Sequence, residues 1–165
     1  MDNEVKTIVF VEDSEVEFVA YRNVLEKAGF CVQPAKDGLE AMRLLHNIAP
    51  DLVLLDLLLP RFDGVEVMKY IRSEARLKNV PVIIFSTNSI IDSEDEPLLA
   101  AATKRLLKSQ CTPALMVRAV REVLAAVATK PAGAEAATTP AKPSPYEMDP
   151  EMNTAQRAEA ALADS

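Results

Sequence analysis

Residues 51–56 read DLVLLD, a run of four apolar residues between two carboxylates. A strand with one face in water alternates apolar and polar residues, whereas this run has no alternation, which is typical of a strand covered on both faces. Asp56 continues into a further apolar run, and a carboxylate so placed is unfavourable unless a partner compensates its charge. The stretch therefore predicts a central strand of a covered sheet, with a functional group at its carboxyl end.

Four further apolar runs predict strands before and after this one. They lie at 6–11, 30–35, 80–85 and 105–108. Pro34 lacks a backbone donor, so the strand at 30–35 is expected at an edge of the sheet. Because segments of helical period separate the five runs, they indicate right-handed βαβ units. The predicted fold class is α/β with a doubly wound, five-stranded parallel sheet, an architecture in which ligands bind at the carboxyl ends of the strands.

Capping residues and helical spacing predict the intervening helices. Ser14, Asp37 and Thr112 are expected to cap the first, second and last helices. The fourth helix is expected to be short and to begin near Glu96 or Pro97, because proline removes a backbone donor and restricts the residue before it. The expected apolar stripes are Val16, Ala20, Val24 and Ala28 in the first helix, Leu39, Met42 and Leu45 in the second, Val65, Met68 and Ile71 in the third, and Val117, Val120, Leu124 and Val127 in the last.

The composition limits the functions that the chain can have. Its 165 residues carry a net charge of −7, and no basic patch stands out, which argues against a nucleic-acid surface. The first residues carry acids and no long apolar segment, so neither a signal peptide nor a membrane span is expected. Cys31 and Cys111 are expected to be free thiols in a reducing compartment, and we expect the protein to be cytoplasmic.

A boundary is predicted close to residue 128. Residues 1–128 carry the strand and helix signals, whereas residues 129–165 are rich in alanine and proline and have no sustained apolar period. That composition is typical of a flexible tail. We therefore expect one domain at 1–128 and a disordered tail at 129–165 that contains no output domain.

Charged and polar side chains follow four of the predicted strands. Glu12 and Asp13 follow the first, Asp56 ends the third, Ser86 and Thr87 end the fourth, and Lys108 ends the fifth. Crowded carboxylates repel one another, and a divalent cation removes that conflict. Hard oxygen ligands with room for water and phosphate oxygens suit Mg²⁺. With a lysine as a second positive charge, the predicted site is arranged to hold a phosphoryl group beside a carboxylate.

Four segments resemble the response regulator receiver family of two-component signal transduction. They read VFVEDSE (9–15), LVLLDLLLPRFDG (52–64), PVIIFST (81–87) and LLK (106–108). The segments fall at strand ends in the order found in that family, and the resemblance covers Lys6 to about Val127. It implies a flavodoxin-like fold with strand order 2-1-3-4-5. It also implies a stand-alone receiver that acts as a signalling phosphoacceptor and not as an enzyme.

The same resemblance implies a role for each site residue. Asp56 would accept a phosphoryl group from a histidine kinase or a phosphotransfer protein, with Lys108 binding the phosphate and Ser86 as the switch hydroxyl. The implied metal ligands for Mg²⁺ are Asp13, Asp56 and the backbone carbonyl of Leu58, with Glu12 acting mostly through metal-bound water. Signalling would follow from a conformational change that alters the binding of a partner protein.

Two positions depart from the family pattern and leave an alternative open. Arg105 stands where the family usually has Tyr or Phe, so the usual inward swing of an aromatic ring is absent. Ser109 replaces the proline that usually follows the lysine, so a trans peptide is expected there. A protein-interaction module that does not switch is therefore the alternative to a working receiver.

Two other functions fit the sequence less well. A Mg²⁺-dependent phosphohydrolase of the haloacid-dehalogenase type would resemble a DxD motif after the first strand, whereas this chain has Asp13, Ser14 and Glu15. A flavodoxin-like cofactor binder would need a phosphate loop rich in hydroxyls and glycine at the same place. Two acids there, Glu12 and Asp13, would repel the phosphate.

Overall fold

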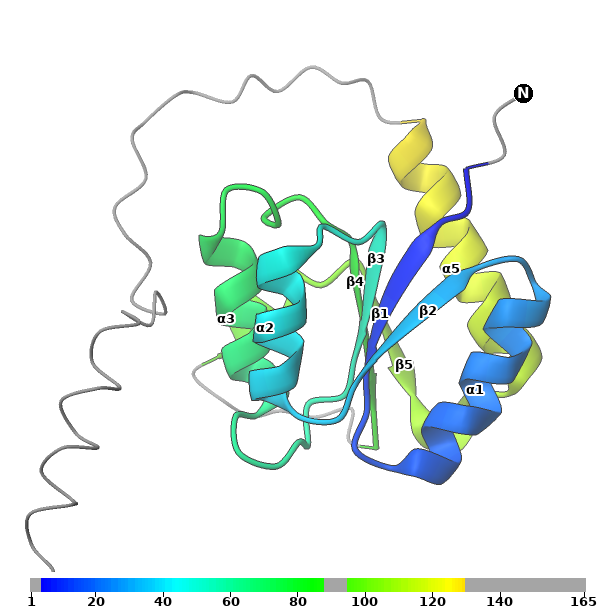
Figure 1. The fold of residues 1–165 in the computed structure, drawn as a ribbon, viewed down its shortest axis with the longest axis horizontal. Coiled ribbons are helices and arrows are strands. Elements are labelled where there is room, and N and C mark those ends of the chain that lie inside the picture. Colours follow the sequence, from blue (N-terminus) through cyan, green and yellow to red (C-terminus); the bar gives the residue numbers. More distant parts are fainter. Residues whose placement is uncertain (1–3, 88–94, 130–165) are drawn as a thin grey trace, which may run out of the picture. The chain divides into compact units, whose positions relative to one another are not determined.

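Five parallel strands form one sheet in the order β2-β1-β3-β4-β5 (Figure 1), which confirms the predicted fold class and strand order. The structure is a computed structural model, and it describes residues 4–87 and 95–129. The strands are β1 (Thr7–Val11), β2 (Cys31–Ala35), β3 (Leu52–Leu55), β4 (Val82–Ser86) and β5 (Lys104–Leu107). The helices are α1 (Glu15–Lys27), α2 (Gly38–Asn47), α3 (Gly64–Ser73), α4 (Glu96–Leu99), the short 3-10 helix η1 (Lys108–Gln110) and α5 (Pro113–Ala128).

The chain divides into two units, Met1–Ala134 and Glu135–Ser165, and all described residues belong to the first. The tail expected at 129–165 lies outside the described residues, apart from Thr129 at the end of α5. Among the helices of the two described ranges, none has the length and apolar character needed to cross a membrane.

The central strand is β3, as its sequence predicts. All four of its residues are buried, and it pairs with β1 on one side and with β4 on the other. Successive side chains of a strand point to opposite faces, so a strand covered on both faces needs an apolar residue at every position. β2, which contains Pro34, lies at an edge of the sheet, as expected from the missing donor.

Helices cover both faces of the sheet (Figure 1), and a hydrophobic layer lies between the sheet and the helices on each face. Helices α1 and α5 pack on the face that carries Phe10, Leu54 and Phe85. Helices α2, α3 and α4 pack on the opposite face, which carries Val9 and Val53. Burial of one such side chain stabilises the fold by about 1.5–3 kcal/mol, so both layers hold the sheet together.

The helices begin at the predicted caps. The side chains of Ser14, Asp37 and Thr112 each accept a hydrogen bond from the backbone N–H three residues further on. Helix α4 is one turn long with Pro97 in its first turn, which confirms the expected short helix. Asp63 caps α3 in the same way, although it is not among the caps predicted from the sequence.

The apolar stripe expected for α1 is wrong. Val16 is 82% exposed, and Ala20 is exposed as well. The residues that pack against the sheet are Phe18, Tyr21 and Leu25. The ring of Phe18 lies 5.4 Å from that of Phe10. Aromatic side chains bury far more apolar area than alanine or valine, so they set the rotation of the helix.

The stripe expected for α5 holds with one exception. The buried residues of this helix are Met116, Ala119, Val120 and Val123, with Val117 and Leu124 partly buried beside them. Val127 is 44% exposed, so its expected inward position is wrong. It fits the period of the stripe but lies in the last turn of the helix, outside the hydrophobic layer.

The loop from β3 to α3 returns to the carboxyl end of β3 at Gly64. A Cβ atom at this position would lie 2.3 Å from the carbonyl oxygen of Asp56 and 2.6 Å from Cα of Leu57. The N–H of Gly64 donates to the carbonyl of Leu57 at 3.0 Å. Glycine is therefore required by this close approach of backbone to backbone, next to Asp56.

We expect Gly64→Ala to lower the free energy of unfolding by about 2–4 kcal/mol, because backbone atoms would have to shift to admit the Cβ. Gly29→Ala is the matched control. Gly29 has a φ of 97° but no heavy atom within 4 Å of an added Cβ, so only the left-handed backbone is penalised, by about 1–2 kcal/mol. Urea unfolding measures both variants, and a smaller loss at Gly64 than at Gly29 would contradict the close approach.

Candidate functional site

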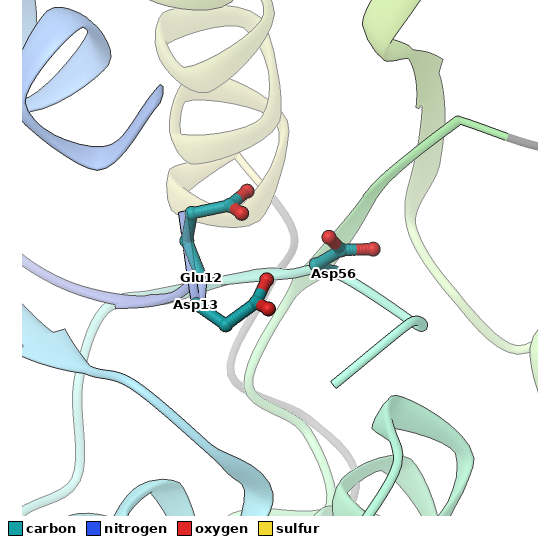
Figure 2. A group of neighbouring side chains, drawn as sticks. All are labelled: Glu12, Asp13 and Asp56. Carbon is teal, nitrogen blue, oxygen red and sulfur yellow. The ribbon is translucent and has the colours of Figure 1, made fainter. Parts of the chain in front are cut away.

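The register of the strands brings three acidic residues to one edge of the sheet. Val11 of β1 is level with Leu55 of β3, so the next residues, Glu12 and Asp56, emerge side by side. Carboxylate oxygens of Glu12, Asp13 and Asp56 lie within 4.8 Å of one another. Figure 2 shows the three side chains gathered at one place, two from the segment after β1 and one from the segment after β3.

Ser86 and Lys108 come to the same edge from the neighbouring strands. Ser86 ends β4, is buried and pairs with Leu107 of β5. Lys108 follows directly and begins η1. Thr87 is exposed, so Ser86 is the buried hydroxyl of the two that end this strand.

Lys108 extends its ammonium group into the carboxylate cluster. Its Nζ atom lies 2.7 Å from Asp56 Oδ2, 2.6 Å from Glu12 Oε2 and 2.5 Å from Glu17 Oε2. Nζ also lies 5.3 Å from the ring centre of Phe85. Burial alone would lower the pKa of Lys108, but hydrogen bonds to the three carboxylates outweigh burial and hold the pKa above its usual value. The ammonium group therefore stays charged.

Glu12 is the most deeply buried carboxylate of the cluster. Its side chain is 0% exposed, and Oε1 accepts a hydrogen bond from the N–H of Ser14 at 3.1 Å. Burial raises the pKa of Glu12 to about 7, even though Lys108 and the N–H of Ser14 favour the charged form. The negative charge of Glu12 is thus incompletely compensated by the protein alone.

The Asp56 carboxylate is held from two sides. Oδ1 accepts a hydrogen bond from the N–H of Leu58 at 3.0 Å, and Oδ2 faces the ammonium group of Lys108. Asp56 is buried, whereas Leu58 is 64% exposed and contacts the cluster through its backbone N–H. The expected role of its carbonyl as a metal ligand stays a prediction.

One member of the cluster was not predicted from the sequence. Glu17 lies in the first turn of α1, where an acid interacts favourably with the helix dipole without needing a specific partner. That position gave no reason to expect a contact with Lys108, which lies 91 residues away in the sequence. The packing of α1 on the sheet reveals the contact.

The donor set of the cluster fits a divalent cation. Glu12, Asp13 and Asp56 each offer a hard carboxylate oxygen at one place. Asp13 is exposed, so solvent reaches the cluster from its side. Carboxylates combined with water are the ligands that suit Mg²⁺. The incomplete compensation of Glu12 is a second reason, because a cation would stabilise its charged form.

The sequence matches the family of response regulator receiver domains over residues 8–121. The chain belongs to this family. The polar-differentiation response regulator DivK of Brucella ovis is 32% identical to it over 90 residues, which are 54% of this chain and 73% of DivK. The fold also resembles that of chemotaxis response regulator CheY4 of Vibrio cholerae, with a TM-score of 0.66 and 24% identity over 72% of this chain and 98% of CheY4.

Two further receiver structures are similar. One is the receiver domain of sensor histidine kinase PA1611 from Pseudomonas aeruginosa, which has a magnesium ion coordinated in its active site cleft. It is 26% identical to this chain with a TM-score of 0.66, and the match covers 73% of this chain and 98% of the PA1611 domain. The other is the phosphorylated cyanobacterial phytochrome response regulator RcpA, which is 31% identical to this chain with a TM-score of 0.63. The match covers 76% of this chain and 97% of RcpA.

Receiver domains are signalling phosphoacceptors of two-component systems and not classic enzymes. The family binds Mg²⁺ at an acidic site and interacts with histidine kinases and phosphotransfer proteins. Because the chain belongs to the receiver family, the two other functions considered from the sequence, a phosphohydrolase and a flavodoxin-like cofactor binder, are disfavoured.

The two departures from the family pattern occupy β5 and η1. Arg105 lies in β5, and its Nη2 atom is 3.0 Å from Glu96 Oε1 of α4, with 39% of the arginine side chain exposed. An ion pair between β5 and α4 thus stands where the family usually has an aromatic ring. Ser109 lies within η1, and the peptide bonds of the described residues are all trans, as expected.

We expect the metal-free receiver to lose stability as the pH rises from about 4.5 to 7. Because burial raises the pKa of Glu12 to about 7, the folded protein keeps a proton that the unfolded chain releases near pH 4.5. The stabilisation that comes from this retained proton is complete below the pKa that Glu12 has in the unfolded chain. It is lost as the pH rises through the pKa that Glu12 has in the folded protein. It amounts to about 1–3 kcal/mol.

Urea unfolding in the presence of a chelator across this pH range measures the effect, and Glu12→Gln is the control because glutamine does not titrate. Carboxylates remote from Glu12 contribute alike to both proteins and cancel in the difference, and Lys108 stays charged over this range. The stability of the wild type relative to Glu12→Gln should decline as the pH rises. A difference that stays constant would show that Glu12 keeps an ordinary pKa.

Proposed function

We propose that this chain is a response regulator in which Asp56 accepts a phosphoryl group from a phosphohistidine of a histidine kinase or phosphotransfer protein, in a Mg²⁺-dependent phosphorelay in the cytoplasm. One observation carries the proposal. The buried carboxylate of Asp56 lies 2.7 Å from the ammonium group of Lys108, and one of its oxygens lies within 4.8 Å of carboxylate oxygens of Glu12 and Asp13. A nucleophile in that position has both a positive charge and a cation-binding group beside it.

The proposed reaction is an in-line displacement at phosphorus. A carboxylate oxygen of Asp56 forms the new O–P bond while the P–N bond of the phosphohistidine breaks, and the imidazole nitrogen keeps the electron pair. Catalysis of this kind consists mostly of positioning and of neutralising charge. The N–H of Leu58 orients the carboxylate, and Lys108 donates to the oxygens of the incoming phosphoryl group.

We further propose Asp13, Asp56 and the carbonyl of Leu58 as ligands of Mg²⁺, with Glu12 acting mostly through bound water. The ion would supply neutralisation of the phosphoryl charge. The side chain of Glu12 is fully buried and already held by Lys108 and the N–H of Ser14, whereas Asp13 is exposed, and this difference supports the division. Ser86, buried at the end of β4, is the proposed hydroxyl that donates to the phosphoryl oxygens and couples phosphorylation to the loop that follows.

The proposed organisation is a receiver domain at 1–128, followed by a segment at 129–165 that is not part of it. In this arrangement the phosphorylated domain acts by docking to a partner protein. The identity of that partner would follow from proteins that co-purify with the wild type and not with Asp56→Asn.

A second candidate is an interaction module that has the receiver fold but does not switch. The ion pair of Arg105 with Glu96 favours it, because a charged side chain that is partly in water has no reason to move into the space that an aromatic ring would fill. In this case Asp56 could still be phosphorylated, but the surface of β5 and α4 would not respond.

We expect the full chain to gain the mass of one phosphoryl group when it is incubated with acetyl phosphate and Mg²⁺. Asp56→Asn should gain none, because the amide is not a nucleophile of this kind. Asp51→Asn is the matched control, since Asp51 lies at the opposite end of the same strand, beside Lys6 and Thr7. Intact-mass spectrometry reads the result, and a chelator should abolish the gain in the wild type. An equal gain of phosphoryl mass in the wild type and in Asp56→Asn would disprove Asp56 as the phosphoacceptor.

We expect a phosphoryl mimic such as beryllofluoride to shift the backbone amide signals of Asp56, Leu58 and Thr87 but to leave those of Arg105 and its neighbours in β5 nearly unchanged. The reason is that Arg105 is already paired with Glu96. Two-dimensional NMR of the labelled protein with and without the mimic measures this. Large shifts along β5 and α4 would mean that the receiver switches without the aromatic ring.

A further inference from the structure

The ammonium group of Lys108 has a third partner outside the set of acids that the proposed phosphorylation uses. Glu17 Oε2 lies 2.5 Å from Nζ. An ammonium group has three N–H donors, and three carboxylates surround it here, those of Glu12, Asp56 and Glu17. A phosphoryl oxygen can therefore accept a hydrogen bond from Lys108 only when one of these carboxylates loses its own hydrogen bond to the ammonium group.

The three carboxylates differ in how readily they can leave. Glu12 is fully buried and is held by the N–H of Ser14. Asp56 is the group that reacts. Glu17 is 39% exposed, and within the described residues its carboxylate has no partner other than Lys108. Water can take over its hydrogen bonds at little cost, so Glu17 is the partner that can be displaced.

Glu17 also changes the charge that an incoming anion meets. It adds a fourth carboxylate to a cluster that Lys108 alone compensates within the described part of the chain. Charges a few ångströms apart near a protein surface interact by about 1 kcal/mol or more. Glu17 therefore opposes the approach of a phosphate group and reduces the positive charge that Lys108 presents to it.

We propose that Glu17 is a positioning residue that competes with the phosphoryl group for Lys108 and thereby slows the phosphorylation of Asp56. Before the reaction Glu17 holds the ammonium group on the side of α1. As the phosphoryl group bonds to Asp56, Lys108 exchanges Glu17 for a phosphoryl oxygen, and the carboxylate of Glu17 turns to water. The inference rests on Asp56 as the phosphoacceptor.

The test is the initial rate of phosphorylation of the full chain by acetyl phosphate with Mg²⁺, read by intact-mass spectrometry. In this reaction a carboxylate oxygen of Asp56 attacks phosphorus, and acetate leaves with the electron pair of the broken P–O bond. We expect Glu17→Gln to react about fivefold faster than the wild type, from the loss of one nearby charge and of its bond to Lys108.

Glu15→Gln is the matched control. Glu15 lies in the same first turn of α1, is exposed and forms no ion pair with any residue that the structure describes. Its substitution removes the same charge from the same helix without touching Lys108. We expect its rate to stay within about twofold of the wild type, since exposed charges are screened by salt.

Glu17→Asp separates the contact from the charge. Aspartate keeps the negative charge, but its side chain is one methylene group shorter, which lengthens or breaks the contact with Lys108. We expect this variant to react faster than the wild type but more slowly than Glu17→Gln, because only the contact is lost. A purely structural role for Glu17 would lower the stability of the variants in urea and leave this order of rates unexplained.

The outcomes distinguish this inference from the proposed function. If Glu17→Gln reacts no faster than Glu15→Gln, or more slowly than the wild type, Glu17 does not compete for Lys108 while Asp56 remains the phosphoacceptor. If Glu17→Asp matches the wild type, only the charge acts and the competition for the ammonium group is disproved. If the folded wild type takes up no phosphoryl group, the proposed function itself fails, and the inference fails with it.

Discussion

One ammonium group makes the arrangement of this receiver possible. Glu12 and Asp56 are both buried, and two buried carboxylates would be strongly unfavourable without a positive charge beside them. Lys108 supplies that charge from the end of β5, 96 residues along the chain from Glu12. The ends of three strands, β1, β3 and β5, are thereby held to one another electrostatically as well as by the sheet.

Much of this arrangement could be predicted because burial of a strand on both faces produces a recognisable sequence pattern. A strand covered on both faces must be apolar throughout, so the carboxylate of Asp56 after such a run needed an explanation. Parallel strands end at the same edge of a sheet, so the sequence alone predicts that Glu12, Asp56 and Lys108 lie close together. Caps such as Ser14 and Asp37 were equally accessible, because their side chains act on backbone groups only three residues away.

The contacts that escaped prediction depend on how one element rotates against another. The first helix contains two overlapping apolar stripes, and only its packing on Phe10 shows that Phe18 and not Val16 turns inward. That same rotation brings Glu17 to Lys108. The sequence places Glu17 one turn along a helix, but the distance to a strand end far away in the chain is set by the tertiary structure.

The ion pair between Arg105 and Glu96 has a consequence for how β5 and α4 are coupled. An aromatic ring packs by excluding water, and its contacts hardly depend on the ions in solution. Two charges that are each partly exposed attract one another less as the ionic strength rises, since the screening length is about 8 Å at physiological salt. The link between this strand and this helix should therefore loosen in a salty medium, which makes the face formed by β5 and α4 sensitive to the cell's electrolyte content.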